Sequence, residues 1–439
     1  MSPGNKVSQQ RRFSSHTNIF IRLGFMFILS FNFSFLFGQT DVKRLDDYTL
    51  KIAIVGPSDE IFIWWGHAAL IVEDTRWNFS RVYDWGIFFY PSDNFLEDFI
   101  KNNVHYEVTT GSYNLNDYIR EDRDVTVYTL DMDRPGKELM LSYAENIVLP
   151  ENCKYDYHEF RDNCSTGIRD IIDLGTRGQF KSTFDNIPGR FSYRQHIRRF
   201  TWSRPLPDWF LGFLMGRDLD RQITAWDEMF LPVEIARNIV DFKYLDDYGA
   251  ERRLVSFTEI LNSSKDRTPV LNKDLVTWPF FLTAGLICAA LLFFLDSRRK
   301  IYPRLRVLWG PIQSILGMIL GLSGCVLTLG LFFMSNDYIQ QNFNIFFVNP
   351  LLLLIVPLGI LCAANKSFLL NTEKCLRVLW SYVFISGSVT MLINILPFLN
   401  QQNQSVYGLI LPIAFALSGI TEKKYKLKAL ARKIKRSFT

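Results

Sequence analysis

Long apolar runs occupy both ends of this chain, and the stretch between them mixes apolar and polar positions. One run lies between Arg22 and Asp41, and five more follow residue 275, at 276–295, 307–334, 345–364, 378–399 and 406–420. Because about 20 apolar residues span a bilayer, the five later runs predict transmembrane helices, although the last is short. The first run predicts either a cleaved signal or a retained N-terminal anchor, since the small-residue cleavage pattern after it is poor.

The loops between the later runs predict which side of the membrane each part occupies. The loops at 297–306 and 365–377 and the tail after Ile420 contain five, three and eight Lys or Arg. The alternate loops, SNDYIQQNFN and NQQNQS, contain none. Under the positive-inside rule, the tail is cytoplasmic and the stretch before the first helix is exported. We therefore divide the chain into a signal or anchor, an exported domain, a transmembrane domain and a basic tail, at 1–39, 40–275, 276–420 and 421–439.

The exported stretch has the patterns of an α+β domain. KIAIVGP, the segment 61–72, RVYDWGIFFY and DVTVYTLDM are rich in β-branched and aromatic residues and predict strands. GKELMLSYAENIVLP predicts a helix with Leu139, Tyr143 and Ile147 on its apolar face. STGIRDIIDLG predicts a second, short helix, which Asn163 caps and Gly175 ends.

Composition narrows the possible functions. Of 439 residues, 49 are Lys or Arg and 44 are Asp or Glu, so the net charge is only +5. That balance, with 48% hydrophobic residues, excludes a disordered chain and a nucleic-acid binder that relies on overall charge. The predicted membrane helices contain no Asp, Glu, Lys, Arg or His, which disfavours a transporter. They fit an anchor or a platform that presents lipid to the exported domain.

Cys164 is the candidate nucleophile of the exported domain. It follows Asn163 at the start of the short helix, where the helix dipole stabilises a thiolate. His67, in the strand-like run WWGHAAL, is the candidate base. The competing possibilities are a Cys153–Cys164 disulfide in an oxidising compartment and a structural role for His67. The two exported cysteines have no CxxC spacing and no histidine cluster accompanies them, so we expect no metal site.

Five segments resemble the periplasmic domain of the Lnb-type bacterial lipoprotein N-acyltransferases. In order they are GHAALIVED with YDWG, YDYHEFRDNCSTGIRDIID, FSYRQHIRRF and AWDEMFLP, within residues 50–240. The resemblance implies a permuted NlpC-type papain-like fold, in which Cys164 is the nucleophile and His67 the base. The chain departs from the family at Trp64 and Trp65, where smaller or polar residues are expected, and in KNNVHYEVTTGSYN.

The same resemblance implies a reaction. An acyl chain would pass from phospholipid to Cys164 as a thioester, and then to the N-terminal amine of a diacylglyceryl-Cys lipoprotein at the bacterial inner membrane. Such transfer needs no metal, ATP or organic cofactor, and no nucleic acid takes part. Asp84, Asn163 and Ser165 are candidates for orienting His67 or supporting the oxyanion.

Aromatic residues provide the candidate contacts to the acyl chain or the membrane. They are Trp64, Trp65, Trp209 and Phe210, with Phe88, Phe89 and Tyr90 as further apolar surface. The segment 206–216 either dips into the bilayer surface or forms a buried helix. Two other functions stay open: a papain-like envelope hydrolase (a phospholipase, cell-wall endopeptidase or amidase) and a non-catalytic envelope scaffold.

Overall fold

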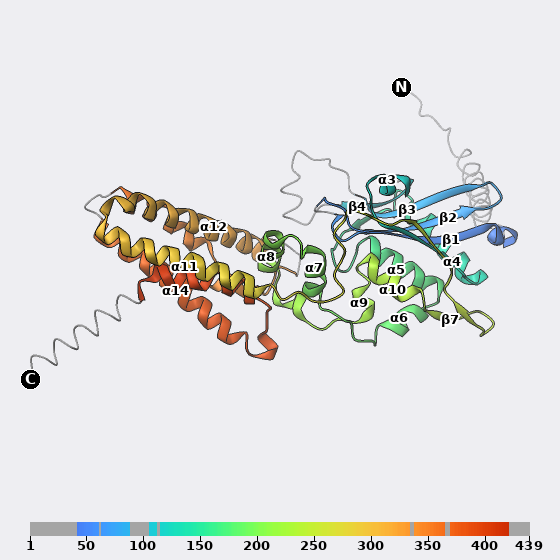
Figure 1. The fold of residues 1–439 in the computed structure, drawn as a ribbon. Coiled ribbons are helices and arrows are strands. Elements are labelled where there is room, and N and C mark those ends of the chain that lie inside the picture. Colours follow the sequence, from blue (N-terminus) through green and yellow to red (C-terminus); the bar gives the residue numbers. More distant parts are fainter. Residues whose placement is uncertain are drawn as a thin grey trace, which may run out of the picture.

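The computed structural model describes residues 42–60, 63–87, 105–111, 115–333, 338–364 and 369–420. It consists of an α+β domain followed by a helical region, as the sequence predicts, and the two lie end to end (Figure 1). The proposed signal or anchor, the residues 88–90 and the basic tail lie outside the described residues.

A seven-stranded sheet forms the centre of the α+β domain. Its strands are ordered β6-β4-β3-β2-β1-β5-β9, and each is antiparallel to its neighbours. The strands are β1 (Tyr48–Val55), β2 (His67–Asp74), β3 (Phe79–Ile87), β4 (His105–Thr110), β5 (Val125–Leu130), β6 (Lys154–Asp156) and β9 (Val255–Asn262). β7 (Lys243–Leu245) and β8 (Glu251–Arg253) form a separate hairpin, and η1 (Val42–Asp47) precedes β1.

Helices cover one face of this sheet and build the main core against it. α4 (Arg134–Ile147) and α5 (Cys164–Gly175) lie on that face, while α3 (Leu115–Arg120) lies on the other (Figure 1). β2 is buried along its first six residues because it is a central strand covered on both faces, which explains its unbroken apolar run.

The predicted apolar face of α4 is wrong at two of its three positions. Leu139 and Tyr143 are exposed, whereas Ile147 is partly buried and packs against the core beside Met140, Leu141 and Ala144. The helix itself is confirmed, and so is the apolar face of α5, where Ile168, Ile171 and Ile172 are all buried.

Short helices connect the core to the membrane region. They are α6 (Gln179–Phe184), α7 (Tyr193–Thr201), α8 (Pro205–Leu214), η3 (Arg217–Asp220), α9 (Ala225–Glu228) and α10 (Pro232–Ile239). The membrane region contains α11 (Trp278–Ile301), η4 (Pro303–Leu305), α12 (Arg306–Phe333), η5 (Phe343–Phe346), η6 (Pro350–Leu354), α13 (Ile355–Ala363), α14 (Leu369–Ile393), η7 (Pro397–Leu399) and α15 (Gln404–Ser418).

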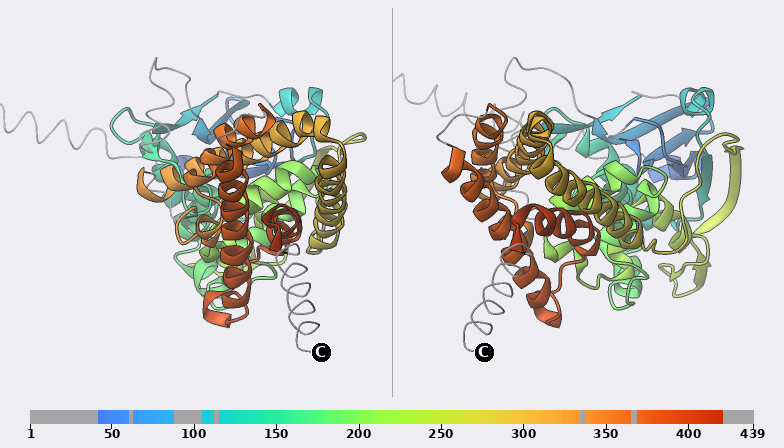
Figure 2. Two further views of the ribbon diagram at one scale, coloured as in Figure 1. Left: turned by 90° about the vertical axis from the view of Figure 1, so that its left-hand side faces the viewer. Right: turned by 60° about the vertical axis from the view of Figure 1, so that its left-hand side comes forward.

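Four of the five predicted membrane helices have the length and composition to cross a bilayer. They occupy Trp278–Ile301, Pro303–Phe333, Phe343–Ala363 and Asn371–Ile393. The fifth predicted helix is α15, which is apolar but shorter. It packs so closely on α11 that a Cβ added at Gly285 would lie 2.3 Å from the Gly408 carbonyl oxygen. Figure 2 views the molecule from the side of this bundle, with the sheet behind it.

The two bundle loops that lack Lys and Arg lie against the α+β domain. Gly216 donates its amide to the Tyr338 carbonyl at 2.7 Å, and the Arg198 guanidinium donates to the Gln402 side chain at 3.0 Å. Arg217 donates to the Gln341 side chain at 2.6 Å. The loops that the charge pattern places outside are thus on the same side as the exported domain.

Candidate active site

Asn163 fixes the start of α5 and therefore the position of Cys164. Its Oδ1 accepts the amides of Ser165 and Thr166 at 2.8 and 2.9 Å, and its own amide donates to Thr166 Oγ1 at 2.8 Å. Its side-chain amide donates to the carbonyls of Glu159 and Phe230. Such reciprocal capping satisfies the free amides of a first helical turn. The predicted cap is confirmed, and Cys164 is the first residue of the helix.

Close packing brings this helix start onto the sheet. α5 contacts β3 through Gly167, where an added Cβ would come within 2.7 Å of the Trp85 ring. A larger residue would push α5 off the sheet and move Cys164 away from β2 and β3.

His67 is the first residue of β2 and approaches the same place from the sheet. Gly66 precedes it with a φ of +87°, and a Cβ at Gly66 would lie 2.5 Å from the Val55 carbonyl oxygen. Only glycine allows this turn. His67 Nε2 lies 3.0 Å from Asp84 Oδ1, and Asp84, on the neighbouring strand β3, is fully buried. Because the Asp84 carboxylate occupies Nε2, the other ring nitrogen of His67, Nδ1, is left to interact with the Cys164 sulfur.

The electrostatics of the pair favour a thiolate beside an imidazolium. Burial lowers the pKa of His67, but the Cys164 charge and hydrogen bonds to Asp84 and Cys164 outweigh it and raise the pKa to about 10. Burial raises the pKa of Cys164, but the His67 charge, its hydrogen bond and the amides of Ala68 and Ser165 lower it overall. A thiolate is the nucleophilic form of cysteine.

Comparison with known families identifies the domain that carries this pair. Residues 38–199 match the family model described as the Lnb N-terminal periplasmic domain. This stretch is an Lnb-type periplasmic domain. The chain is a multi-pass membrane protein whose Lnb-type domain is periplasmic. Neither the curated proteins nor the solved structures contain a match to the chain.

Two tyrosines and a glycine complete the surroundings of Cys164 in the Lnb-type domain. β3 has a bulge between Asp84 and Ile87, and Gly86 lies within it with a φ of +82°. A Cβ at Gly86 would be 4.0 Å from the Cys164 Cβ, 3.7 Å from Tyr155 Oη and 3.6 Å from the Tyr157 ring. Tyr155 Oη is buried and has no hydrogen-bond partner among the described residues.

The sequence analysis missed these three residues. Tyr155 lies in the three-residue strand β6, which pairs with β4 and has no alternating pattern. The sequence signals were the family-like segments YDWG, which contains Gly86, and YDYHEFRDNC, which contains Tyr155 and Tyr157.

The other predicted support residues fall into different environments. Ser165 is fully buried, and its hydroxyl has no partner among the described residues, while its amide faces the cap and the sulfur. Asn163 is a helix cap at 5% exposure. Asp84, a candidate for orienting His67, lies with its Oδ1 3.0 Å from His67 Nε2.

The predicted aromatic contacts are divided between the domain core and the membrane junction. Trp64 is buried beneath the Arg204 guanidinium, and Trp65 is partly buried and packs on a core cluster. Trp209 and Phe210 lie on α8 at the junction with the bundle, where Trp209 donates to the Ser405 carbonyl at 3.1 Å. Trp209 is partly buried and Phe210 is exposed, so α8 is not a fully buried helix, and its insertion into the bilayer surface stays a prediction.

Cys153 and Cys164 are both free, so the alternative disulfide is not formed. Within the described ranges, no group of three or more His, Cys, Asp or Glu side chains could hold a metal ion.

Proposed function

We propose that this Lnb-type protein is a lipoprotein N-acyltransferase of the bacterial inner membrane. It would transfer an acyl chain from phospholipid to the N-terminal amine of diacylglyceryl-Cys lipoproteins. The observation that carries the proposal is the pairing of Cys164 with His67, in which each group favours the charged form of the other, with Asp84 Oδ1 3.0 Å behind the imidazole. A strand histidine facing a helix-start cysteine is the papain-like arrangement, which supports covalent acyl transfer.

The first half-reaction breaks the phospholipid ester. The Cys164 thiolate attacks the acyl carbonyl carbon, and the carbonyl oxygen becomes an oxyanion. When the C–O bond breaks, the departing glycerol oxygen takes the proton from His67 and leaves as lysophospholipid. The products are a Cys164 thioester and a neutral His67.

The second half-reaction forms the amide. The lipoprotein α-amine attacks the thioester carbon, and neutral His67 accepts a proton from the attacking nitrogen. Collapse of the tetrahedral species expels the Cys164 thiolate and restores the starting ion pair. No group besides the two substrates is consumed, so we expect ping-pong kinetics without a cofactor.

Two donors are placed to stabilise the oxyanion. The cap occupies the amides of Ser165 and Thr166, and the Asn163 carbonyl accepts the amide of Gly167. The Cys164 amide is therefore the donor of this first turn that is left for a substrate oxygen. Tyr155 Oη, which like the Cys164 Cβ lies within 4.0 Å of a Cβ placed at Gly86, supplies a second donor, because burial raises the pKa of Tyr155 and keeps it protonated.

Contacts with the membrane region support a lipid substrate over a wall polymer. Tyr338, in an outer loop of the bundle, donates from its hydroxyl to Glu159 at 3.1 Å. Its ring contacts His158 and Phe160. The segment immediately before Cys164 is thus fastened to the outer end of the bundle, where phospholipid esters lie.

The test is mass spectrometry of lipoprotein N-termini in a host depleted of its own N-acyltransferase. We expect full-length wild type to install the third acyl chain, and Cys164→Ala and His67→Ala to fail at equal protein levels. Third-chain installation by Cys164→Ala would overturn the proposal. Release of free fatty acid without any amide product would assign the same pair to a phospholipase instead.

A further inference from the structure

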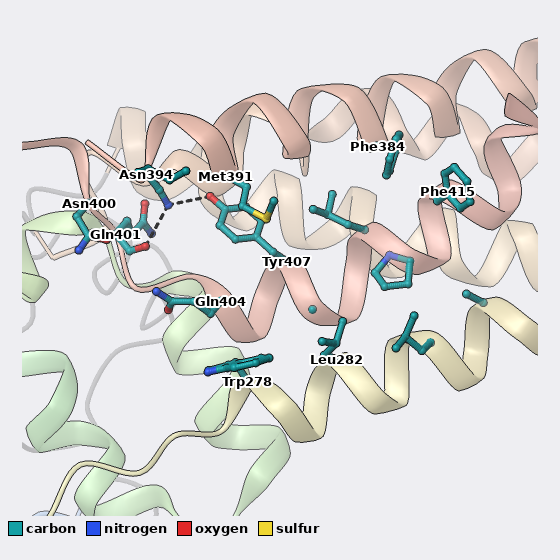
Figure 3. A pocket seen from close by; sticks show the side chains of 16 residues that line it. Trp278, Leu282, Phe384, Met391, Asn394, Asn400, Gln401, Gln404, Tyr407 and Phe415 are labelled. Atoms are coloured by element: carbon teal, nitrogen blue, oxygen red, sulfur yellow. Dashed lines mark hydrogen bonds between the residues drawn. The ribbon is translucent and has the colours of Figure 1, made fainter. Parts of the chain in front are cut away.

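An apolar groove opens on the side of the membrane bundle. It lies between α11, α14 and α15 and has a volume of ≈ 750 Å³ (Figure 3). Apolar side chains such as Leu282, Phe384, Met391 and Phe415 form most of its lining. The size lies within the range of pockets that hold small organic ligands.

The groove extends over about half the thickness of a bilayer. Its lining runs from Trp278 to Ala289 on α11 and from Gln404 to Phe415 on α15. At 1.5 Å per helical residue each stretch covers roughly 16 Å, close to half of the ~30 Å hydrocarbon core. Trp278 begins the first helix after the periplasmic domain, so this end is the outer one. The groove therefore matches the outer leaflet alone.

Neutral polar side chains gather at the outer end of the groove. Asn394, Asn400, Gln401 and Gln404 lie there, and no charged residue contributes to the lining (Figure 3). Asn394 Nδ2 donates to the Gln401 carbonyl and to Tyr407 Oη at 3.0 and 2.9 Å. This fixes the amide and leaves Asn394 Oδ1 buried without a partner among the described residues. A mouth of this kind suits the uncharged glycerol region of a lipid.

The mouth of the groove is also attached to the periplasmic domain. The Gln401 side chain donates to the Met215 carbonyl at 2.9 Å, and Trp209 of α8 contacts Phe281 of α11. A lipid in the groove would have its ester region on the side of the domain that carries Cys164.

We infer that this groove binds one acyl chain of an outer-leaflet phospholipid. That the bound phospholipid is the acyl donor rests on the proposed function, but the binding itself does not depend on Cys164. Because no charged side chain lines the groove, occupancy depends on the acyl chain and little on the headgroup.

The test uses full-length protein in nanodiscs that contain phosphatidylethanolamine or phosphatidylglycerol with a diazirine midway along one acyl chain. Ala289→Trp fills the deep end of the groove, and the matched control, Ala290→Trp, adds the same ring on the exposed face of α11. Both are made in Cys164→Ser, so that no turnover occurs. After irradiation, peptides of α11, α14 and α15 are analysed for lipid adducts.

We expect adducts on groove residues with both headgroups. Ala289→Trp should reduce them about tenfold, which corresponds to a loss of 1.4 kcal/mol of binding free energy. Ala290→Trp should leave them unchanged. Equal labelling in the two variants would overturn the inference. So would cross-linking that shows the chain's own segment 22–41, or a second copy, in the groove. Groove labelling together with an inactive wild type would refute the proposed acyl transfer and leave the lipid site standing.

Discussion

Two buried histidines in the periplasmic domain have similar carboxylate partners but opposite charge preferences. His67 Nε2 lies 3.0 Å from Asp84, and His196 Nε2 lies 2.9 Å from Glu228. The pKa of His67 is raised to about 10, whereas burial lowers the pKa of His196. Burial is the largest influence on both pKa values, and at His67 the Cys164 charge and the Asp84 carboxylate outweigh it. His196 has no such thiolate, and its Nδ1 lies 2.7 Å from the Arg199 guanidinium, whose charge lowers the pKa further.

The comparison shows that a histidine–carboxylate pair does not by itself make a reactive site. Arg199 donates to His196 and also to Glu234 at 2.8 Å, and all three side chains are fully buried. This closed cluster joins α7 to α10. The pair at His67 instead ends in Cys164, a residue that is only partly buried and carries a thiol that can react. What distinguishes the reactive pair from the structural one is the residue at the second ring nitrogen, Cys164 or Arg199, and whether a substrate can approach it.

Replacing each histidine by alanine gives the largest expected contrast. His67→Ala removes the proton carrier and should lower acyl transfer by about 10³–10⁴-fold. His196→Ala should leave the reactivity of folded protein within about twofold, but lower the unfolding temperature, because buried Arg199 and Glu228 lose a partner. Activity per folded molecule and thermal unfolding are the measurements. A comparable loss of reactivity in folded His196→Ala would contradict the separation.

Neutralising each carboxylate tests the same separation more finely. Asp84→Asn removes a hydrogen bond and a charge that raise the pKa of His67, so the thiolate fraction falls; we expect roughly a 10²-fold slower acylation. Glu228→Gln should instead lower the free energy of unfolding by about 1–3 kcal/mol, because the Glu228 carboxylate accepts hydrogen bonds from His196 and from the Phe191 amide. Denaturant unfolding and single-turnover acylation distinguish the two effects.

Tyr155→Phe tests the proposed oxyanion donor. The substitution removes the phenol oxygen and keeps the ring, so we expect acylation to slow by roughly 10–10²-fold. This is no more than the rate loss that follows removal of one well-placed oxyanion donor. The alkylation rate of Cys164 by iodoacetamide, which forms no oxyanion, should not change. If alkylation and acylation fall together, Tyr155 acts on the thiolate and not on the substrate.

The smallest effect is a shift in a pH profile. In wild type, Cys164 alkylation should begin below pH 9, because the thiol pKa is lowered, and change again near pH 10 as His67 loses its proton. In His67→Ala, burial still raises the pKa of Cys164, but the His67 charge that lowers it is gone. The onset of alkylation should therefore move to higher pH. Cys153→Ser in both backgrounds removes the other periplasmic thiol. An unchanged onset would mean that His67 does not set the thiol pKa.

The sequence predicted the parts of the site that have local signals. Cys164 and Asn163 were recognisable because a capping residue precedes an amphipathic stretch, and His67 because it lies in a strand-like run, although the strand itself begins only at His67. The burial of Asp84 and the approach of Tyr155 were not predictable, since both depend on strand pairing across the sheet. The groove could not be predicted from the sequence either, because it forms where α11 packs on α15, which lies more than a hundred residues further along the chain.

The most direct measurement is the covalent state of Cys164 when purified full-length protein is incubated with phospholipid and no lipoprotein. Intact-protein and peptide mass spectrometry should find one fatty acyl group on the Cys164 peptide, removed by neutral hydroxylamine and transferred when a diacylated lipopeptide is added. The adduct should be absent in Cys164→Ala. Amide formation on the lipopeptide without any Cys164 adduct, or by Cys164→Ala, would contradict the account.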